Sequence, residues 1–271
     1  MSGQRAMNLR VFTCIAMAAA LALTVSFAAA AATPTKAFAG GKTSVWVIDK
    51  AVTKYTGAKS TDTITYNKNG LVTCHKSVTK GEDNYNETYS DNYGYTSKSA
   101  FKKFIVKING EKQGSFTFTL NSKGYVTKSV QKSTTTGNKY AYTYKYNKKG
   151  QVSSIKSKRE TFTYKFNSKG LLSQITMKSN EGDKSVFGYK YDSKGNLTKG
   201  LYNKKTERTY KNTYKNGRLA KQVVKGTDGT VMYTCTYTYK KVKVPKSLVK
   251  MIKEQQGILA NHQYAMYLTH K

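Results

Sequence analysis

Residues 187–199 read FGYKYDSKGNLTK, an aromatic strand, a tight turn and the start of a second strand. In the turn, the Asp192 side chain can accept a hydrogen bond from the backbone two residues on, and Gly195 can take the positive φ that closes a type I turn followed by a G1 bulge. This geometry predicts that Tyr191 lies directly opposite Leu197. The stretch therefore specifies a β-hairpin with a large apolar pair beside its turn.

Variants of this turn recur along most of the chain. The residues assigned to turns, and hence to the scaffold, are Asn67, Gly70, Asn121, Gly124, Asn147, Gly150, Asn167, Gly170, Asp192, Gly195, Asn216 and Gly217. The same count predicts the opposed pairs Tyr66 with Val72, Leu120 with Val126, Tyr146 with Val152, Phe166 with Leu172 and, across a two-residue Asn-Gly type I′ turn, Tyr214 with Leu219. With Gly94 as a weaker turn glycine, the turns lie 20 to 30 residues apart, which is typical of a repeat array.

Between the turns, large side chains occupy every second position, as in Phe162, Tyr164 and Phe166. Thr, Lys and Gly lie between them, so each strand has an aromatic face and a polar face. Ile155 and Ile175 break this phase, which predicts either a bulge or apolar cover on the second face. The sequence thus predicts an all-β fold, an antiparallel β-hairpin repeat array over residues 40–242, curled or extended.

The two ends of the chain differ from this array. Residues 1–39 begin with Arg5 and Arg10, continue with an apolar run and end in small residues, the layout of a secretory signal peptide, with a membrane anchor as the alternative. Residues 243–271 are expected to form a short amphipathic helix and a tail. Pro245 suits its first turn, and the helix should end near Gly257. Its apolar stripe either caps the sheet or docks on an anionic membrane.

The chain is strongly basic, with 47 Lys and Arg against 14 Asp and Glu and a formal net charge of +33. Removal of residues 1–39 takes away three positive charges and no negative ones, which leaves +30. Such a charge attracts polyanions over long distances. Two interpretations stay open: the lysines bind anionic polymers outside the cell, or they only fill the solvated face of a sheet and protect its edges.

Two cysteines, Cys74 and Cys235, remain after removal of residues 1–39. In an open sheet they would lie far apart, so we expect separate, mostly buried thiols, with a disulfide possible only if the sheet closes. The stretch 85–101 is less regular, and Glu82, Asp83, Glu87 and Asp91 cluster around it. Since the spacing matches no calcium loop, a solvated hairpin paired with lysines is the expectation.

No constellation of residues identifies a reaction. The three histidines are His75, His262 and His270, and His75 cannot use Cys74 as a nucleophile because strand neighbours point to opposite faces. We therefore expect no catalytic, cofactor-binding or metal-binding residues, no cofactor and no enzymatic activity. The candidate ligand-stacking residues are Tyr142, Tyr144, Tyr164 and Tyr189, for which core packing is the alternative.

The block Tyr191-Asp192-Ser193-Lys194-Gly195-Asn196-Leu197 resembles the YD repeats of RHS-type proteins. The likeness covers about residues 60–240 as repeat form, although Asn mostly replaces Asp, and Arg precedes Leu only at Arg218. It implies a β-hairpin array on an exported surface protein. Continued to Gly200, the block also resembles choline- or glucan-binding cell-wall repeats. These depend on Trp, which the chain lacks after Trp46, so no ligand-binding residue is carried over.

Together these features predict a secreted, non-enzymatic β-repeat protein that associates with the cell surface or an anionic matrix through a Lys-rich face. The alternative is a carbohydrate-recognition module that uses exposed Tyr columns. The expected partners are anionic cell-wall polymers or glycans, with no specific nucleic acid and no transmembrane segment in the mature chain. The oligomeric state stays open.

Overall fold

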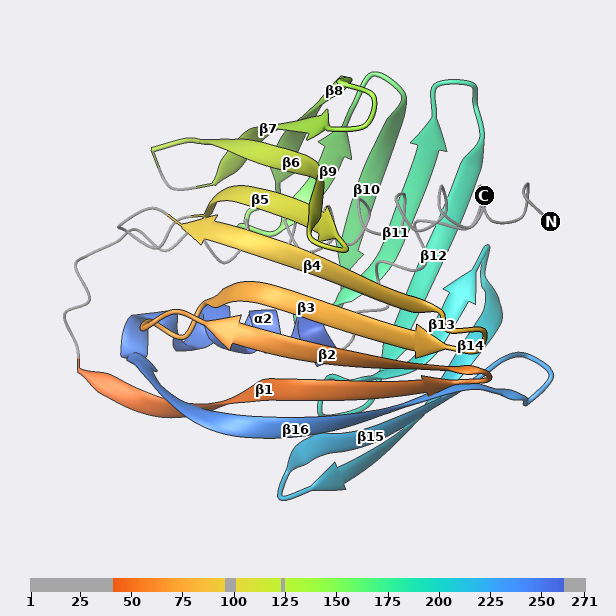
Figure 1. Ribbon diagram of the computed structural model, residues 1–271. Coiled ribbons are helices and arrows are strands. Elements are labelled where there is room, and N and C mark those ends of the chain that lie inside the picture. Colours follow the sequence, from red (N-terminus) through yellow and green to blue (C-terminus); the bar gives the residue numbers. More distant parts are fainter. Residues whose placement is uncertain (1–40, 96–100, 123–124, 261–271) are drawn as a thin grey trace.

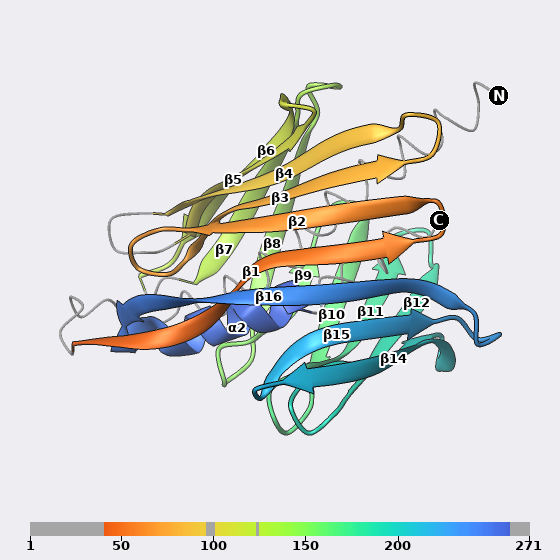
Figure 2. The ribbon, with the colours of Figure 1, turned by 60° about the horizontal axis from the view of Figure 1, so that its bottom comes forward.

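The computed structural model describes residues 41–95, 101–122 and 125–260. Sixteen strands form one antiparallel sheet that closes into a barrel, in which each strand pairs with its neighbours in sequence and β16 pairs with β1 (Figure 1). One helix, α2, lies within the ring of strands in both views of the molecule (Figures 1 and 2).

The strands that flank the six predicted hairpin turns begin and end where those turns require. The strands are β1 (Lys42–Tyr55), β2 (Ala58–Tyr66), β3 (Val72–Gly81), β4 (Asn86–Tyr95), β5 (Phe101–Ile108), β6 (Glu111–Leu120), β7 (Val126–Ser133), β8 (Lys139–Tyr146), β9 (Val152–Lys156), β10 (Glu160–Phe166), β11 (Leu172–Ser179), β12 (Lys184–Tyr191), β13 (Leu197–Tyr202), β14 (Lys205–Lys215), β15 (Arg218–Lys225) and β16 (Val231–Pro245). The 3-10 helix η1 (Lys246–Leu248) and the α-helix α2 (Val249–Ala260) follow.

The predicted turn geometry is confirmed at each hairpin where the turn lies within the described residues. Asp192 Oδ1 accepts hydrogen bonds from the backbone N–H of Lys194 and Asn196, both at 2.9 Å, and Gly195 has φ +83°. Asn216 and Gly217 have φ values of +51° and +75°, as a type I′ turn requires. All six predicted pairs occur: Tyr66–Val72, Leu120–Val126, Tyr146–Val152, Phe166–Leu172, Tyr191–Leu197 and Tyr214–Leu219. Gly124 itself lies outside the described residues.

A bulge follows each of these pairs in the same place. In the last hairpin named, Tyr214 pairs with Leu219 while Thr213 pairs with Lys221, so Ala220 is the extra residue. The corresponding extra residues elsewhere are Thr73, Thr127, Ser153, Ser173 and Thr198. The predicted bulge near Ile155 and Ile175 is therefore confirmed. A bulge bends its strand and increases the twist, so its repetition curls the whole sheet.

Each bulge also interrupts the backbone ladder, and at six of the bulges a side chain of the next strand donates a hydrogen bond to the carbonyl just before the extra residue. Tyr191 illustrates the arrangement, since its hydroxyl donates to the Leu172 carbonyl at 2.6 Å. The equivalent bonds run from Tyr66 to Ile48, Tyr95 to Val72, Tyr146 to Val126 and Tyr239 to Leu219, and from the Asn212 amide to Leu197. We call these contacts the bulge bonds. Phe166 holds the same position opposite Val152 and cannot donate.

The predicted open or curled hairpin array is wrong, because the sheet closes. β1 and β16 pair from Lys42 with Pro245 to Tyr55 with Tyr233, with one bulge between Ile48 and Lys50. Two physical features favour closure: the repeated bulges curl the sheet, and the inward aromatic faces then pack into one core cluster that receives side chains from strands all round the ring.

The predicted C-terminal helix is present and extends past Gly257 to Ala260. Leu248, Met251 and Ile252 pack against Val47, Leu71 and Val244, which form a second core cluster. Gln256 accepts a hydrogen bond from the Ile48 N–H at 2.6 Å and Gln255 accepts one from the Val72 N–H at 3.3 Å. The helix therefore satisfies backbone donors beside two of the bulges while its apolar stripe covers the neighbouring strand ends.

Three local expectations need correction. Gly94 is not a turn residue, since it lies inside β4 opposite Lys103. The acidic stretch around Asp91 is not a solvated hairpin, because Asn86–Tyr95 is one strand and Asp91 is buried. Cys74 and Cys235 are free thiols as expected, but only β1 and β2 separate their strands, so they are much closer than an open sheet would allow.

Candidate functional site

The outward faces of the strands are rich in lysine. β8 shows the pattern: Tyr142 and Tyr144 belong to the core or pack against it, whereas Lys139 and Lys145 are exposed. Because successive side chains in a strand point to opposite faces, the aromatic columns line the inside of the barrel and the lysines and threonines cover the outside.

Few of these lysines have acidic partners. Between described residues, the one ion pair of a lysine or arginine with a carboxylate joins Lys240 Nζ to Asp49 Oδ1 at 2.7 Å. Arg218 lies over the Trp46 ring, with its Cζ 4.1 Å from the ring centroid. The outer face thus has a strong positive charge that contacts within the described chain leave largely unneutralised.

The four candidate stacking residues all lie on the inner face. Tyr144, Tyr164 and Tyr189 are buried, with exposed fractions of 7, 6 and 5 %, and Tyr142 is half-buried. The Tyr144 hydroxyl is 2.8 Å from that of Ser129, and the Tyr142 hydroxyl donates to Gln131 at 3.3 Å. A ligand could stack on these rings only inside the barrel, so the stacking role stays a prediction.

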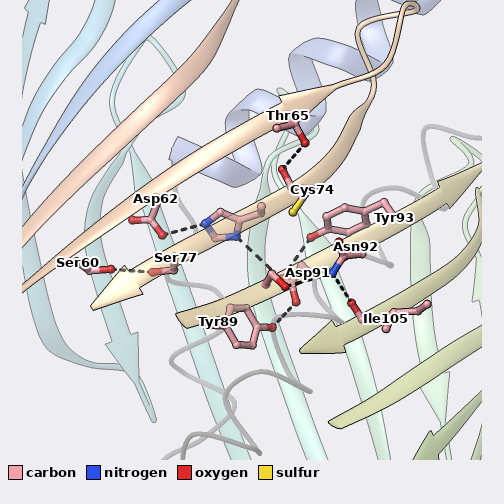
Figure 3. Close-up of polar contacts among 12 residues, drawn as sticks. Ser60, Asp62, Thr65, Cys74, Ser77, Tyr89, Asp91, Asn92, Tyr93 and Ile105 are labelled. Carbon is pink, nitrogen blue, oxygen red and sulfur yellow. Dashed lines mark hydrogen bonds and ion pairs between the residues drawn. The ribbon is translucent and has the colours of Figure 1, made fainter. Parts of the chain in front are cut away.

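A second candidate site was missed in the sequence. His75 on β3 contacts Asp62 on β2 and Asp91 on β4, and both carboxylates are labelled in Figure 3. Its Nε2 is 2.9 Å from Asp62 Oδ1, and its Nδ1 is 4.0 Å from Asp91 Oδ2. Tyr89 and Tyr93 donate their hydroxyls to the two oxygens of Asp91, the latter at 3.4 Å. We call these five residues the histidine cluster.

The electrostatics of the cluster follow from burial and charge. Burial lowers the pKa of His75, but the hydrogen bond and charge of Asp62, with the charge of Asp91, outweigh it and raise that pKa above its usual value. Burial raises the pKa of Asp91 to about 7, against the His75 charge and the two Tyr hydroxyls, which lower it. Through these contacts His75 on β3 connects the two neighbouring strands, β2 and β4, inside the barrel.

The sequence of β2 contains a signal for this cluster, because Asp62 shares the buried face of the strand with Ser60 and Ile64. A charged residue at such a position requires a partner. The partner is His75. Adjacency in the sequence suggests His75 only as a base for Cys74, and that role is excluded because the side chains of these neighbours belong to opposite faces. Burial also raises the pKa of the Cys74 thiol, so it is a poor nucleophile at neutral pH.

Neither a metal centre nor a membrane helix emerges from the part of the chain that the structure describes. Within residues 41–95, 101–122 and 125–260, no group of three or more His, Cys, Asp or Glu could hold a metal ion. In the same ranges, no helix has the length and apolar composition needed to cross a bilayer. His262, His270 and the predicted signal segment 1–39 lie outside the described residues.

Comparison with known proteins adds information on the fold. No family model matches the sequence, and no curated protein matches it. A solved structure of a porin-like protein from Bacteroides uniformis aligns with a TM-score of 0.52 at 16% identity, over 71% of this chain and 98% of that chain. A structure of TcdB2-TccC3 aligns with a TM-score of 0.33 at 11% identity, over 65% of this chain and 12% of that one. The first likeness concerns the fold alone, and the second carries no argument.

Proposed function

We propose that this protein is a non-enzymatic β-barrel that binds anionic polymers at the cell surface or in the surrounding matrix through its lysine-rich outer face. The observation that supports it is the sorting of side chains: tyrosine and phenylalanine point inward, and exposed lysines point outward without carboxylate partners in most of the described chain.

The charge is large enough to matter at a distance. A formal net charge of +33, or +30 without residues 1–39, gives fast, salt-sensitive encounter with polyanions. Self-repulsion on this scale destabilises a compact fold. A protein that retains such a charge gains most from it where polyanions are abundant, as they are in cell walls and extracellular matrices.

The outer face also argues against contact with lipid. Strands that face a bilayer present apolar side chains outward and polar ones inward. In this barrel the order is inverted, as Lys145 is exposed and Tyr144 is buried. An aqueous polyanion is therefore a better partner for the outer face than a membrane interior.

The location outside the cell rests on the sequence of residues 1–39, which has the layout of a signal peptide. Kinship with YD-repeat proteins is likewise a proposal. The recurrence of one turn, one bulge and one bulge bond along the chain supports it, because such regularity is typical of a duplicated unit.

The experiment is a binding titration of the purified protein against purified cell wall and an acidic glycan at increasing salt. We expect measurable binding at low salt that weakens steeply as salt rises, because binding releases counterions. A neutral glycan of similar size serves as the control. Absence of binding to every polyanion at low salt would remove the proposal.

A further inference from the structure

The strand registers place lysines and hydroxyl side chains in lines that run across the sheet. The first line passes from β16 through β1 to β6 by successive directly opposed residues, namely Thr238, Lys50, Thr63, Lys76, Ser90, Lys107 and Lys112. Side chains of directly opposed residues lie on the same face of a sheet, so these seven form a continuous outer band.

A second line has the same chemistry in the same order. It passes from β6 to β12 through Thr119, Lys128, Thr143, Lys156, Thr161, Lys178 and Lys184. Each line reads hydroxyl, lysine, hydroxyl, lysine, hydroxyl, lysine, lysine, and all eight lysines are exposed.

Folding does not account for this arrangement. Lys107 is paired directly with Lys112, and Lys178 with Lys184, although like charges at opposed positions destabilise a sheet. None of the eight lysines forms an ion pair with a carboxylate of the described residues. An external anion would relieve this repulsion.

The spacing of the lines defines the shape of that anion. Strands lie about 4.8 Å apart, so the first three lysines of each line, which lie on alternate strands, are roughly 10 Å apart with a hydroxyl midway between them. The fourth lysine lies on the strand next to the third, about 4.8 Å away. From its first lysine to its last, each line crosses five strand intervals, or about 24 Å. A matching ligand is linear and presents negative charges about 10 Å apart, separated by neutral hydrogen-bonding groups.

We propose that each line binds a linear acidic glycan laid across the strands, with its charged sugars on the lysines and the intervening neutral sugars on the threonine and serine hydroxyls. This inference rests on the proposed function and specifies its ligand and its site. A nucleic acid strand fits less well, because duplex DNA carries one phosphate per 3.4 Å of each strand, a much closer spacing than the roughly 10 Å between lysines on alternate strands.

The two lines are separate sites. On β6, Lys112 ends the first line and Thr119 begins the second, and seven residues along a strand correspond to about 23 Å. One barrel can therefore hold two glycan segments. Binding both segments of one long polymer would raise the apparent affinity through effective concentration.

The test uses the purified protein and three variants that each remove four positive charges. One replaces Lys50, Lys76, Lys107 and Lys112 with Gln, and one replaces Lys128, Lys156, Lys178 and Lys184 with Gln. The matched control replaces Lys68, Lys148, Lys149 and Lys215, which are exposed residues in or beside turns and outside both lines. Melting temperatures verify that all four proteins are folded.

The probes are hyaluronan oligosaccharides of graded length, which carry one carboxylate per two sugars, and single-stranded oligodeoxynucleotides of equal total charge. We expect each line variant to bind hyaluronan at least tenfold more weakly, and the turn control less than threefold. Affinity should rise with oligosaccharide length until the chain spans one line. A double Thr63→Val, Thr161→Val variant should weaken hyaluronan binding and leave oligonucleotide binding unchanged.

Two results would overturn the inference while the proposed function stands. The first is an equal loss of hyaluronan affinity in the turn control and in the line variants, and the second is oligonucleotide binding as tight as that of hyaluronan, since either would mean attraction by diffuse charge. If the unmodified protein binds no polyanion at all, the proposed function fails together with the inference.

Discussion

Replacement of Tyr191 by Phe tests the bulge bonds directly. The change removes one oxygen and leaves the Leu172 carbonyl, which now accepts from the Tyr191 hydroxyl at 2.6 Å, without its partner. An unsatisfied buried acceptor costs about 1–3 kcal/mol. Both residues are half-buried, so water can partly replace the donor, and we expect a loss of about 1–2 kcal/mol in the free energy of unfolding.

The chain supplies the reverse experiment at Phe166. This residue occupies the place in β10 that Tyr191 occupies in β12. Phe166 lies three residues beyond Thr163, and Val152 lies two residues before Ser154, the residue paired with Thr163. Tyr191 and Leu172 lie in the same way around the pair Gly188 and Gln174. Phe166→Tyr should therefore form a bulge bond to Val152. The expected gain is about 0.5–1.5 kcal/mol, the net value of one hydrogen bond.

The assay is urea denaturation followed by tyrosine fluorescence and far-UV circular dichroism, with the slope m compared between proteins so that a change in midpoint reports stability. Tyr140→Phe is the control, because among the described residues the Tyr140 hydroxyl has one hydrogen-bond partner, the exposed Asn138 amide, which donates to it at 3.4 Å. The reasoning is refuted if Tyr191→Phe changes stability no more than Tyr140→Phe does and Phe166→Tyr fails to stabilise the protein.

Three further predictions concern the cluster, a close contact and the aromatic columns. Asp91 and His75 both have raised pKa values, so their contribution to the free energy of unfolding is largest at acidic pH and declines as pH rises through about 4 to 7 and beyond. Asp91→Asn should flatten the fall in stability between pH 4 and 7. An unchanged dependence of stability on pH would contradict the raised pKa of Asp91. Gly70→Ala should destabilise more than Gly217→Ala in thermal melts: both have positive φ, but only at Gly70 would the new Cβ lie 2.3 Å from Val244 Cγ1, and equal losses would show that backbone strain alone acts. Tyr144→Ala should cost about 3–5 kcal/mol if its ring is core, whereas lost glycan binding at unchanged melting temperature would instead establish a stacking platform.

The turn and its register could be predicted because their causes are local. Asn147 and Gly150 determine the turn conformation within four residues, and that conformation determines which side chain opposes Tyr146. The bulges could also be predicted, because Ile155 departs from the alternation of apolar and polar residues. The sequence pattern does not predict that these small bends, added over sixteen strands, close the sheet into a barrel.

Closure of the barrel and the histidine cluster depend on contacts between distant or successive strands. No turn sequence predicts the pairing of Lys42 with Pro245, since most of the chain lies between the two residues. The cluster needs Asp62, His75 and Asp91 from three strands, and their alignment depends on the exact registers of two hairpins. A periodicity count detects which face a residue occupies but not which residues meet there.

The bulge bonds give the chain a direction of assembly. Each donor lies on the strand that follows its acceptor, so a hairpin acquires its last internal bond only when the next strand arrives, and every such bond points back toward the N-terminus. A polypeptide that emerges N-terminus first can complete these units one after another. The seam between β1 and β16 is the exception, because it must wait for the final strand, and long-range pairing of this kind is slow. Until that seam forms, the inward tyrosines of the first strands remain uncovered, and the time to closure is the interval in which this chain is open to misassembly.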